Sequence, residues 1–139
     1  MGCDIHLHAE IKVNGEWHHY SHPSIDRNYS LFAKMAGVRG DEEPIAEPRG
    51  FPDDASFTTR LDYEHWGADA HTPSWLSGNE LQAVCDFYEE SAKTWGDPKR
   101  YISAEGEQFG FLFGNSWIED DSSRPPGFEG VRWVFWFDN

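Results

Sequence analysis

Polar and apolar residues alternate without exception from Cys3 to Val13. The polar set consists of Asp4, His6, His8, Glu10 and Lys12. Because successive side chains of a strand point to opposite faces, this pattern predicts a long strand with one face on a core.

A hairpin follows, because Asn14-Gly15 is a preferred two-residue turn and residues 17–20 can return as a second strand. With that turn, Glu10 pairs opposite His19 on the polar face, and Ile11 pairs opposite His18 on the apolar face. The sequence therefore predicts an N-terminal β-hairpin of defined register.

Helical periodicity appears in two segments before the middle of the chain. Apolar residues in 26–37 follow a helical spacing, with Asp26 or Asn28 as the N-cap and Gly37 as the stop. Residues 54–66 predict a weaker helix without a clean apolar face. The segment between them is rich in glycine, proline and acidic residues, which predicts a long loop.

A third helix begins at a capping box formed by Ser77 and Glu80. Its apolar stripe contains Leu81, Val84, Cys85, Tyr88, Ala92 and Trp95. Gly96 and Pro98 are expected to end it.

Two later segments, 109–113 and 131–137, predict strands, and the second is apolar on both faces and hence central. The predicted fold is a single α+β domain over residues 1–139. It consists of an antiparallel sheet of about four strands, made of the N-terminal hairpin and two C-terminal strands, with two or three helices on one face.

Composition excludes several classes of function. With 25 acidic and 11 basic residues, the formal net charge of −14 disfavours binding to a nucleic acid polymer. The chain has no apolar run of transmembrane length and no signal peptide before Gly2, and Cys3 and Cys85 form no paired-cysteine motif. We therefore expect a protein that binds no membrane and acts in the cytoplasm.

Asp4, His6 and His8 form a D-x-H-x-H string, which metal-dependent hydrolases often carry on a strand. Alternate strand residues lie about 6.5–7 Å apart on one face, so the three side chains can share a divalent metal. They can instead serve as general acid and base without a cofactor, or form a solvated strand face. Metal binding is the less favoured interpretation, because the barrel in which this string usually occurs needs a longer chain.

Arginine and aromatic residues offer a second candidate site. Its predicted ligand-binding residues are Arg27, Asn28, Tyr29, Arg39, Arg49, Phe51, His71 and Trp75. Guanidinium groups fit phosphate oxygens and aromatic rings stack on bases, so the set favours an anionic nucleotide-type ligand. The alternative is that the arginines pair with nearby acids. His71, just before the capped helix, is also a catalytic candidate if the protein is an enzyme.

Five segments together carry a resemblance: MGCDIHLH, DRNYSLFAKMAGVRG, PRGFPDDAS, HTPSWLSGNEL and WVFWFDN. The chain resembles a family of small bacteriophage-encoded proteins. It is also similar in character to phage proteins that act against nucleotide-signalled immunity. This resemblance implies an anti-defence role in the infected bacterial cell.

The sequence leads to three hypotheses for the function, of which the first is the leading one and the other two are alternatives. The first is sequestration of a small nucleotide immune signal, such as a cyclic dinucleotide or an ADP-ribose derivative, with a homo-oligomer as the expected assembly. The second is a phosphodiesterase-like hydrolase that uses His6, His8 and Asp4. The third is an acidic inhibitor that binds a host protein.

Overall fold

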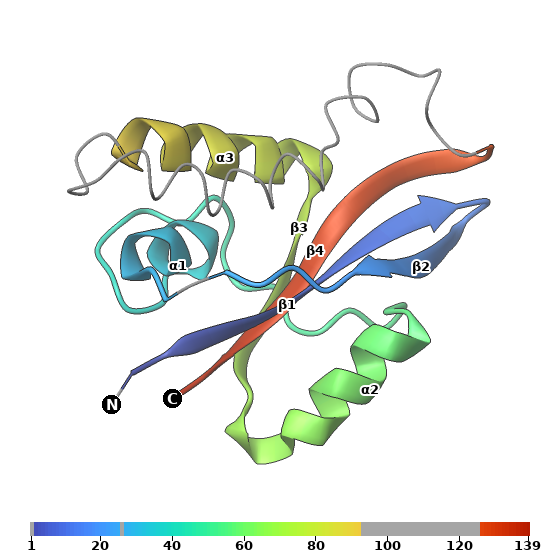
Figure 1. Cartoon of the computed structure of the whole chain (residues 1–139), viewed down its shortest axis with the longest axis horizontal. Helices are drawn as coiled ribbons and strands as arrows, with labels where there is room; N and C mark the ends of the chain where they lie inside the picture. The colour runs from blue at the N-terminus through green and yellow to red at the C-terminus, as the bar shows by residue number, and fades with distance from the viewer. Residues whose placement is uncertain (1, 26, 93–125) are drawn as a thin grey trace.

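In a computed structural model, residues 2–25, 27–92 and 126–139 are described, and they form an antiparallel sheet with three α-helices (Figure 1). The strands are β1 (Asp4–Val13), β2 (Glu16–Ser21), β3 (His71–Ser77) and β4 (Phe128–Asp138). The helices are α1 (Tyr29–Ala36), α2 (Phe57–Trp66) and α3 (Gly78–Ala92), with a short 3-10 turn at Gly67–Asp69. The predicted α+β fold is confirmed.

The centre of the sheet is made by the two ends of the chain, because the strand order is β2-β1-β4-β3. β1 and β4 pair from Asp4 opposite Asp138 to Val13 opposite Phe128. All side chains from Trp133 to Phe137 are fully buried, as expected for a strand that is covered on both faces. The prediction that 131–137 is central is confirmed.

The hairpin between β1 and β2 has the predicted register, with Glu10 opposite His19 and Ile11 opposite His18. Asn14 and Gly15 both adopt positive φ angles, of 50° and 82°, which the tight hairpin turn requires. The register of the pairing between β1 and β2 shifts between Ala9 and Glu10, where the ladder is irregular.

One face of the sheet carries the main core and is covered by α1 and α3 (Figure 1). The apolar positions of β1, including Ile5 and Leu7, pack there with Phe32 of α1 and with Leu81 of α3. Both helices begin as predicted. The Asn28 side chain accepts a hydrogen bond from the Leu31 N–H, and Glu80 accepts one from the Ser77 N–H.

The remaining helix, α2, covers the opposite face of the sheet, which carries the polar positions of β1 (Figure 1). This helix has few apolar residues to bury, and Phe57 and Leu61 stay exposed. It contacts the sheet through polar and aromatic side chains. Two helices therefore lie on one face of the sheet, within the predicted number, and α2 forms a third layer on the other face.

The edge strand β3 consists of residues for which the sequence predicted no strand. It pairs with β4 at the edge of the sheet, with a register shift between His71 and Ser74. Pro73 lies in this irregular part, and proline is tolerated at a sheet edge where its missing N–H breaks no ladder. The predicted strand 109–113 lies outside the described residues, as do Asp26, Trp95, Gly96 and Pro98.

Candidate functional site

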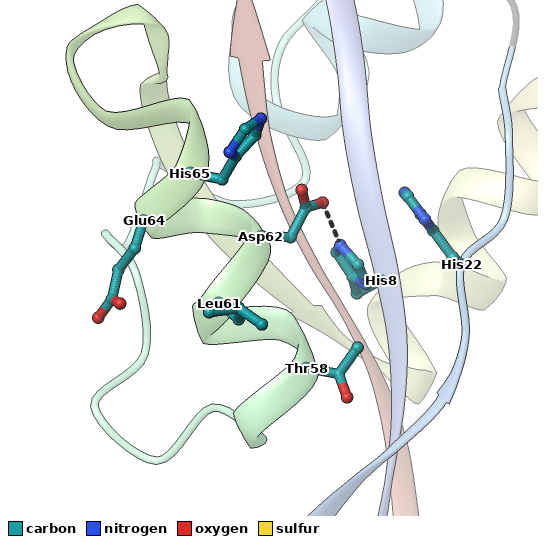
Figure 2. A pocket seen from close by; sticks show the side chains of 7 residues that line it. All are labelled: His8, His22, Thr58, Leu61, Asp62, Glu64 and His65. Atoms are coloured by element: carbon teal, nitrogen blue, oxygen red, sulfur yellow. Dashed lines mark hydrogen bonds and ion pairs between the residues drawn. The ribbon is translucent and has the colours of Figure 1, made fainter.

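His8 lies at the centre of a cluster of imidazole and carboxylate groups between β1, β2 and α2 (Figure 2). Its Nε2 is 2.7 Å from Oδ2 of Asp62, and its Nδ1 is 2.9 Å from Nε2 of His19. The His8 side chain is only 3% exposed. The cluster is thus a continuous hydrogen-bonded chain from Asp62 through His8 to His19.

His22 completes the cluster from the segment that follows β2. Its ring stacks on that of His8, with centroids 4.1 Å apart and an angle of 13° between the planes. One ligating atom each from His8, His22 and Asp62 lies within 4.8 Å of the others. Across the part of the chain that the structure describes, this is the group of three histidine, cysteine or acidic residues close enough to hold one metal ion.

These side chains border an open cavity of about 670 Å³, here called the histidine pocket. Its lining residues are His8, His22, Thr58, Leu61, Asp62, Glu64 and His65. Most of them belong to α2, as Figure 2 shows. A second cavity of about 480 Å³ also includes His22 and extends towards Arg27. His22 therefore borders both cavities, and each of them is large enough for a small ligand.

Burial favours the neutral form of His8 and of His19. It lowers the pKa of His8, and the hydrogen bond to Asp62 only partly opposes this effect. Burial also lowers the pKa of His19, against the charge of Glu10. Neutral rings fit the observed contacts if His8 Nε2–H donates to Asp62 and His19 Nε2–H donates to His8 Nδ1.

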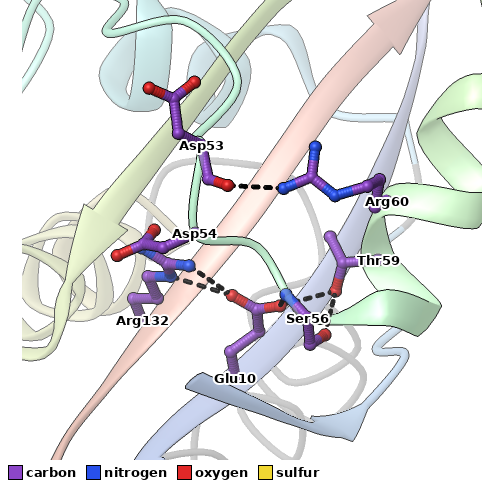
Figure 3. A network of polar contacts seen from close by, with 7 residues as sticks. All are labelled: Glu10, Asp53, Asp54, Ser56, Thr59, Arg60 and Arg132. Atoms are coloured by element: carbon purple, nitrogen blue, oxygen red, sulfur yellow. Dashed lines mark hydrogen bonds and ion pairs between the residues drawn. The ribbon is translucent and has the colours of Figure 1, made fainter. Parts of the chain in front are cut away.

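A buried polar network fixes α2 over the sheet and so places Asp62 against His8 (Figure 3). Glu10 of β1 accepts hydrogen bonds from the Ser56 N–H and the Thr59 hydroxyl, at 2.8 Å each. It also pairs with Arg132 of β4, whose Nη2 is 2.7 Å from Oε1 of Glu10. Burial raises the pKa of Glu10, but the hydrogen bonds from Ser56, Thr59 and Arg132 outweigh it, so the net shift is downward.

The structure does not bring the whole D-x-H-x-H string into one site. Asp4 accepts two hydrogen bonds of 3.0 Å from Arg27. His6 lies 3.3 Å from Asp138 and packs against the ring of Trp66, with centroids 3.9 Å apart. His8 is the member of the string that joins the Asp62 and His22 group.

The predicted ligand-binding arginines are distributed over three separate contacts. Arg27 pairs with Asp4, Arg49 pairs with Glu80, and Arg39 donates to the Asn139 side chain at 3.3 Å. His71 also contacts this Asn139 oxygen, at 3.1 Å, so Arg39 and His71 meet near the end of β4. Arg27 is the predicted arginine that borders a cavity next to the histidine pocket.

The predicted aromatic and capping residues have structural contacts. Asn28 caps α1, and the Tyr29 hydroxyl accepts a hydrogen bond from the Cys3 N–H. Phe51 stacks on Tyr63 of α2, with centroids 4.1 Å apart. The Trp75 ring lies under the Arg49 guanidinium, 4.3 Å from its centre. Their predicted role in ligand binding stays a prediction.

The pairing of Arg49 with Glu80 predicts a loss of stability in acid. The Arg49 guanidinium lowers the pKa of Glu80 from 4.5 to about 2, and hydrogen bonds from Ser77 add to the effect. Because the carboxylate form is favoured by folding, this stabilisation is complete above about pH 4.5 and is lost as the pH falls towards 2. It amounts to at most about 3 kcal/mol, reduced by partial exposure. Chemical denaturation of wild type and Glu80→Gln across this range should show a steeper acid loss in wild type. Parallel curves would contradict the assignment.

Sequence reasoning missed His22 and Asp62 as site residues. Neither residue belongs to a sequence motif, since Asp62 lies in a helix without a clean apolar face and His22 lies in an irregular segment. The predicted pairing of His19 opposite Glu10 did place a second imidazole on the polar face beside His8.

No family model matches the chain, and no curated protein or solved structure is significantly similar to it. In the described part of the chain, no helix is both long and apolar enough to cross a membrane.

Proposed function

We propose that this protein is a hydrolase that acts on a small nucleotide-type molecule bound in the histidine pocket. The observation that carries the proposal is the hydrogen-bonded chain from Asp62 through His8 to His19 beside a cavity of about 670 Å³. A buried imidazole that is oriented by a carboxylate at the edge of a ligand-sized cavity is typical of catalytic sites.

The adjoining cavity supports a phosphate-containing substrate. Arg27 borders it, and the Arg27–Asp4 pair is about half exposed, so this ion pair is weak and an anion can compete with Asp4. The guanidinium fork matches two phosphate oxygens. A nucleotide that spans both cavities would place its phosphate near Arg27 and His22, and an apolar part near Leu61.

Hydrolysis of a phosphoester needs a base and an acid. The oxygen of a water molecule forms a bond to phosphorus while the bond from phosphorus to the leaving oxygen breaks. The water gives up a proton to a base, and the leaving oxygen takes one from an acid. His65 borders the pocket and is exposed, so its imidazole is placed to supply the leaving-group proton. The Asp62 carboxylate, which is partly exposed and lines the pocket, would hold the water and accept its proton as the base, and the hydrogen bond from His8 would keep this carboxylate in place.

Sequestration without cleavage is the second candidate. It is favoured by one observation: both ring nitrogens of His8 already contact protein groups, so a ligand would meet His22 and His65 instead. In this case the protein would capture an immune signal intact, in keeping with the resemblance to phage proteins.

Incubation with a panel of cyclic dinucleotides and ADP-ribose derivatives separates these functions. The protein is then heat-denatured and the supernatant is analysed by chromatography. We expect chemically altered ligand from wild type, and unaltered ligand from Asp62→Asn. Return of an intact compound from a depleted solution would instead support sequestration. Depletion of no compound would contradict both and favour an acidic inhibitor that binds a protein.

A further inference from the structure

We propose that His8, His22 and Asp62 form a binding site for one divalent transition metal ion of the zinc type. This inference deepens the proposed hydrolase, because it concerns the same pocket. Metal binding can nevertheless be measured without any substrate. The two proposals can therefore fail separately.

The geometry supports a shared ion. The three ligating atoms lie within 4.8 Å of one another, and His8 Nε2 lies 2.7 Å from Asp62 Oδ2. Around a tetrahedral zinc ion with bonds of about 2.0–2.1 Å, ligand atoms are about 3.3 Å apart. Movements of an ångström or so would bring these atoms to that spacing.

His22 must turn for the ion to bind. An ion lies in the plane of each imidazole that ligates it, and the His8 and His22 rings are now nearly parallel. His22 is exposed on an irregular segment between β2 and α1, so its ring can rotate without disturbing the core. His8 and Asp62 are held by the sheet and by α2, and they make the fixed part of the site.

A histidine that ligates a metal commonly forms a hydrogen bond through its other ring nitrogen. The contact between His8 and His19 can supply this bond. If His8 Nε2 binds the ion, its proton moves to Nδ1, which then donates to Nε2 of His19 at the observed 2.9 Å. His19 adopts the other tautomer, and both rings stay neutral. His19 is therefore a positioning residue, and it orients His8 without touching the ion.

The donor set indicates the class of metal. Two imidazole nitrogens and one carboxylate oxygen suit zinc and similar transition ions better than magnesium, which prefers oxygen ligands. Three protein ligands beside an open cavity leave a fourth position for water or substrate, as in catalytic zinc sites. An ion there would also offset the negative charge of Asp62 and make the pocket more favourable for a phosphate.

Titration of the purified protein with Co²⁺ tests the site through the visible absorption of the bound ion, and Zn²⁺ competition gives the affinity. We expect one ion per chain, displaced by Zn²⁺ but not by equimolar Mg²⁺. His22→Ala and Asp62→Asn should each weaken binding at least 100-fold, and His19→Ala should weaken it about 10–100-fold.

His65→Ala is the matched control, because His65 borders the same pocket but lies outside the ligand group. It should bind Co²⁺ like wild type, and circular dichroism would verify the fold of each variant. Absence of binding, or equal binding by folded His22→Ala and wild type, would overturn the metal site. Metal binding without turnover would leave the site intact and contradict the hydrolase. Turnover by a protein that binds no Co²⁺ would contradict the metal site and leave the hydrolase intact.

Discussion

Arg132→Met is expected to lower the free energy of unfolding by about 3–5 kcal/mol, because it leaves the Glu10 carboxylate buried without its cation. Glu10 is fully buried and Arg132 is 4% exposed, so water cannot replace the lost partner. Methionine retains much of the packing that the Arg132 side chain makes on Trp17, where the guanidinium lies 4.0 Å from the ring centre. Urea denaturation monitored by tryptophan fluorescence measures the change.

Two further variants separate charge from packing. Adding Glu10→Gln to Arg132→Met should recover part of the loss, since a neutral amide can still accept hydrogen bonds from Ser56 and Thr59. Asp54→Asn removes the other, largely exposed partner of Arg132 and should cost no more than about 1 kcal/mol. A loss in Arg132→Met no larger than that in Asp54→Asn would show that the buried pair does not hold α2 on the sheet.

Asp62→Asn is expected to lower the turnover number of the proposed hydrolase by about 10²–10⁴-fold. The substitution preserves the shape of the side chain but removes the carboxylate base that lies 2.7 Å from His8. Asp62 lies on the side of α2 that faces His8 and is partly exposed, so the fold should tolerate the change. Steady-state kinetics with a compound cleaved by wild type gives the comparison.

Glu64→Gln is the matched control for this prediction. Glu64 lies on the same helix and borders the same pocket, but in Figure 2 its carboxylate points away from His8. Its turnover should stay within a few-fold of wild type. Equal losses in the two variants would indicate a general effect of negative charge, and an unchanged Asp62→Asn would remove Asp62 from catalysis.

The parts of the fold that depend on local sequence could be predicted. The alternation in β1 and the Asn14-Gly15 turn determine the hairpin register, because both act between neighbouring residues. Asn28 and Gly37 likewise define the ends of α1 through contacts within the helix. β3 was not predicted, because His71, Thr72 and Pro73 give no alternating pattern. This segment becomes a strand by pairing with β4.

The candidate site was predictable only in part, for the same physical reason. The alternation placed His8 on the polar face of a strand. Its partner Asp62 is 54 residues away, on a helix whose position depends on the Glu10 and Arg132 network. For the arginines, the sequence predicted a site that the fold does not assemble. Residue type favours phosphate binding, but Arg27 and Arg49 pair with carboxylates that only the folded chain brings near.

NMR of the imidazole side chains is the most direct test of the claim that the histidine pocket is the functional site of the protein. The chain has seven histidines, and ¹⁵N-histidine labelling reports on each ring during addition of Zn²⁺ and then of a nucleotide found active in the panel. We expect one equivalent of Zn²⁺ to change the resonances of His8, His19 and His22, and the nucleotide to change that of His65. His18 and His71, outside the pocket, should not change. No response in the first three, or a uniform response in all seven, would contradict this account.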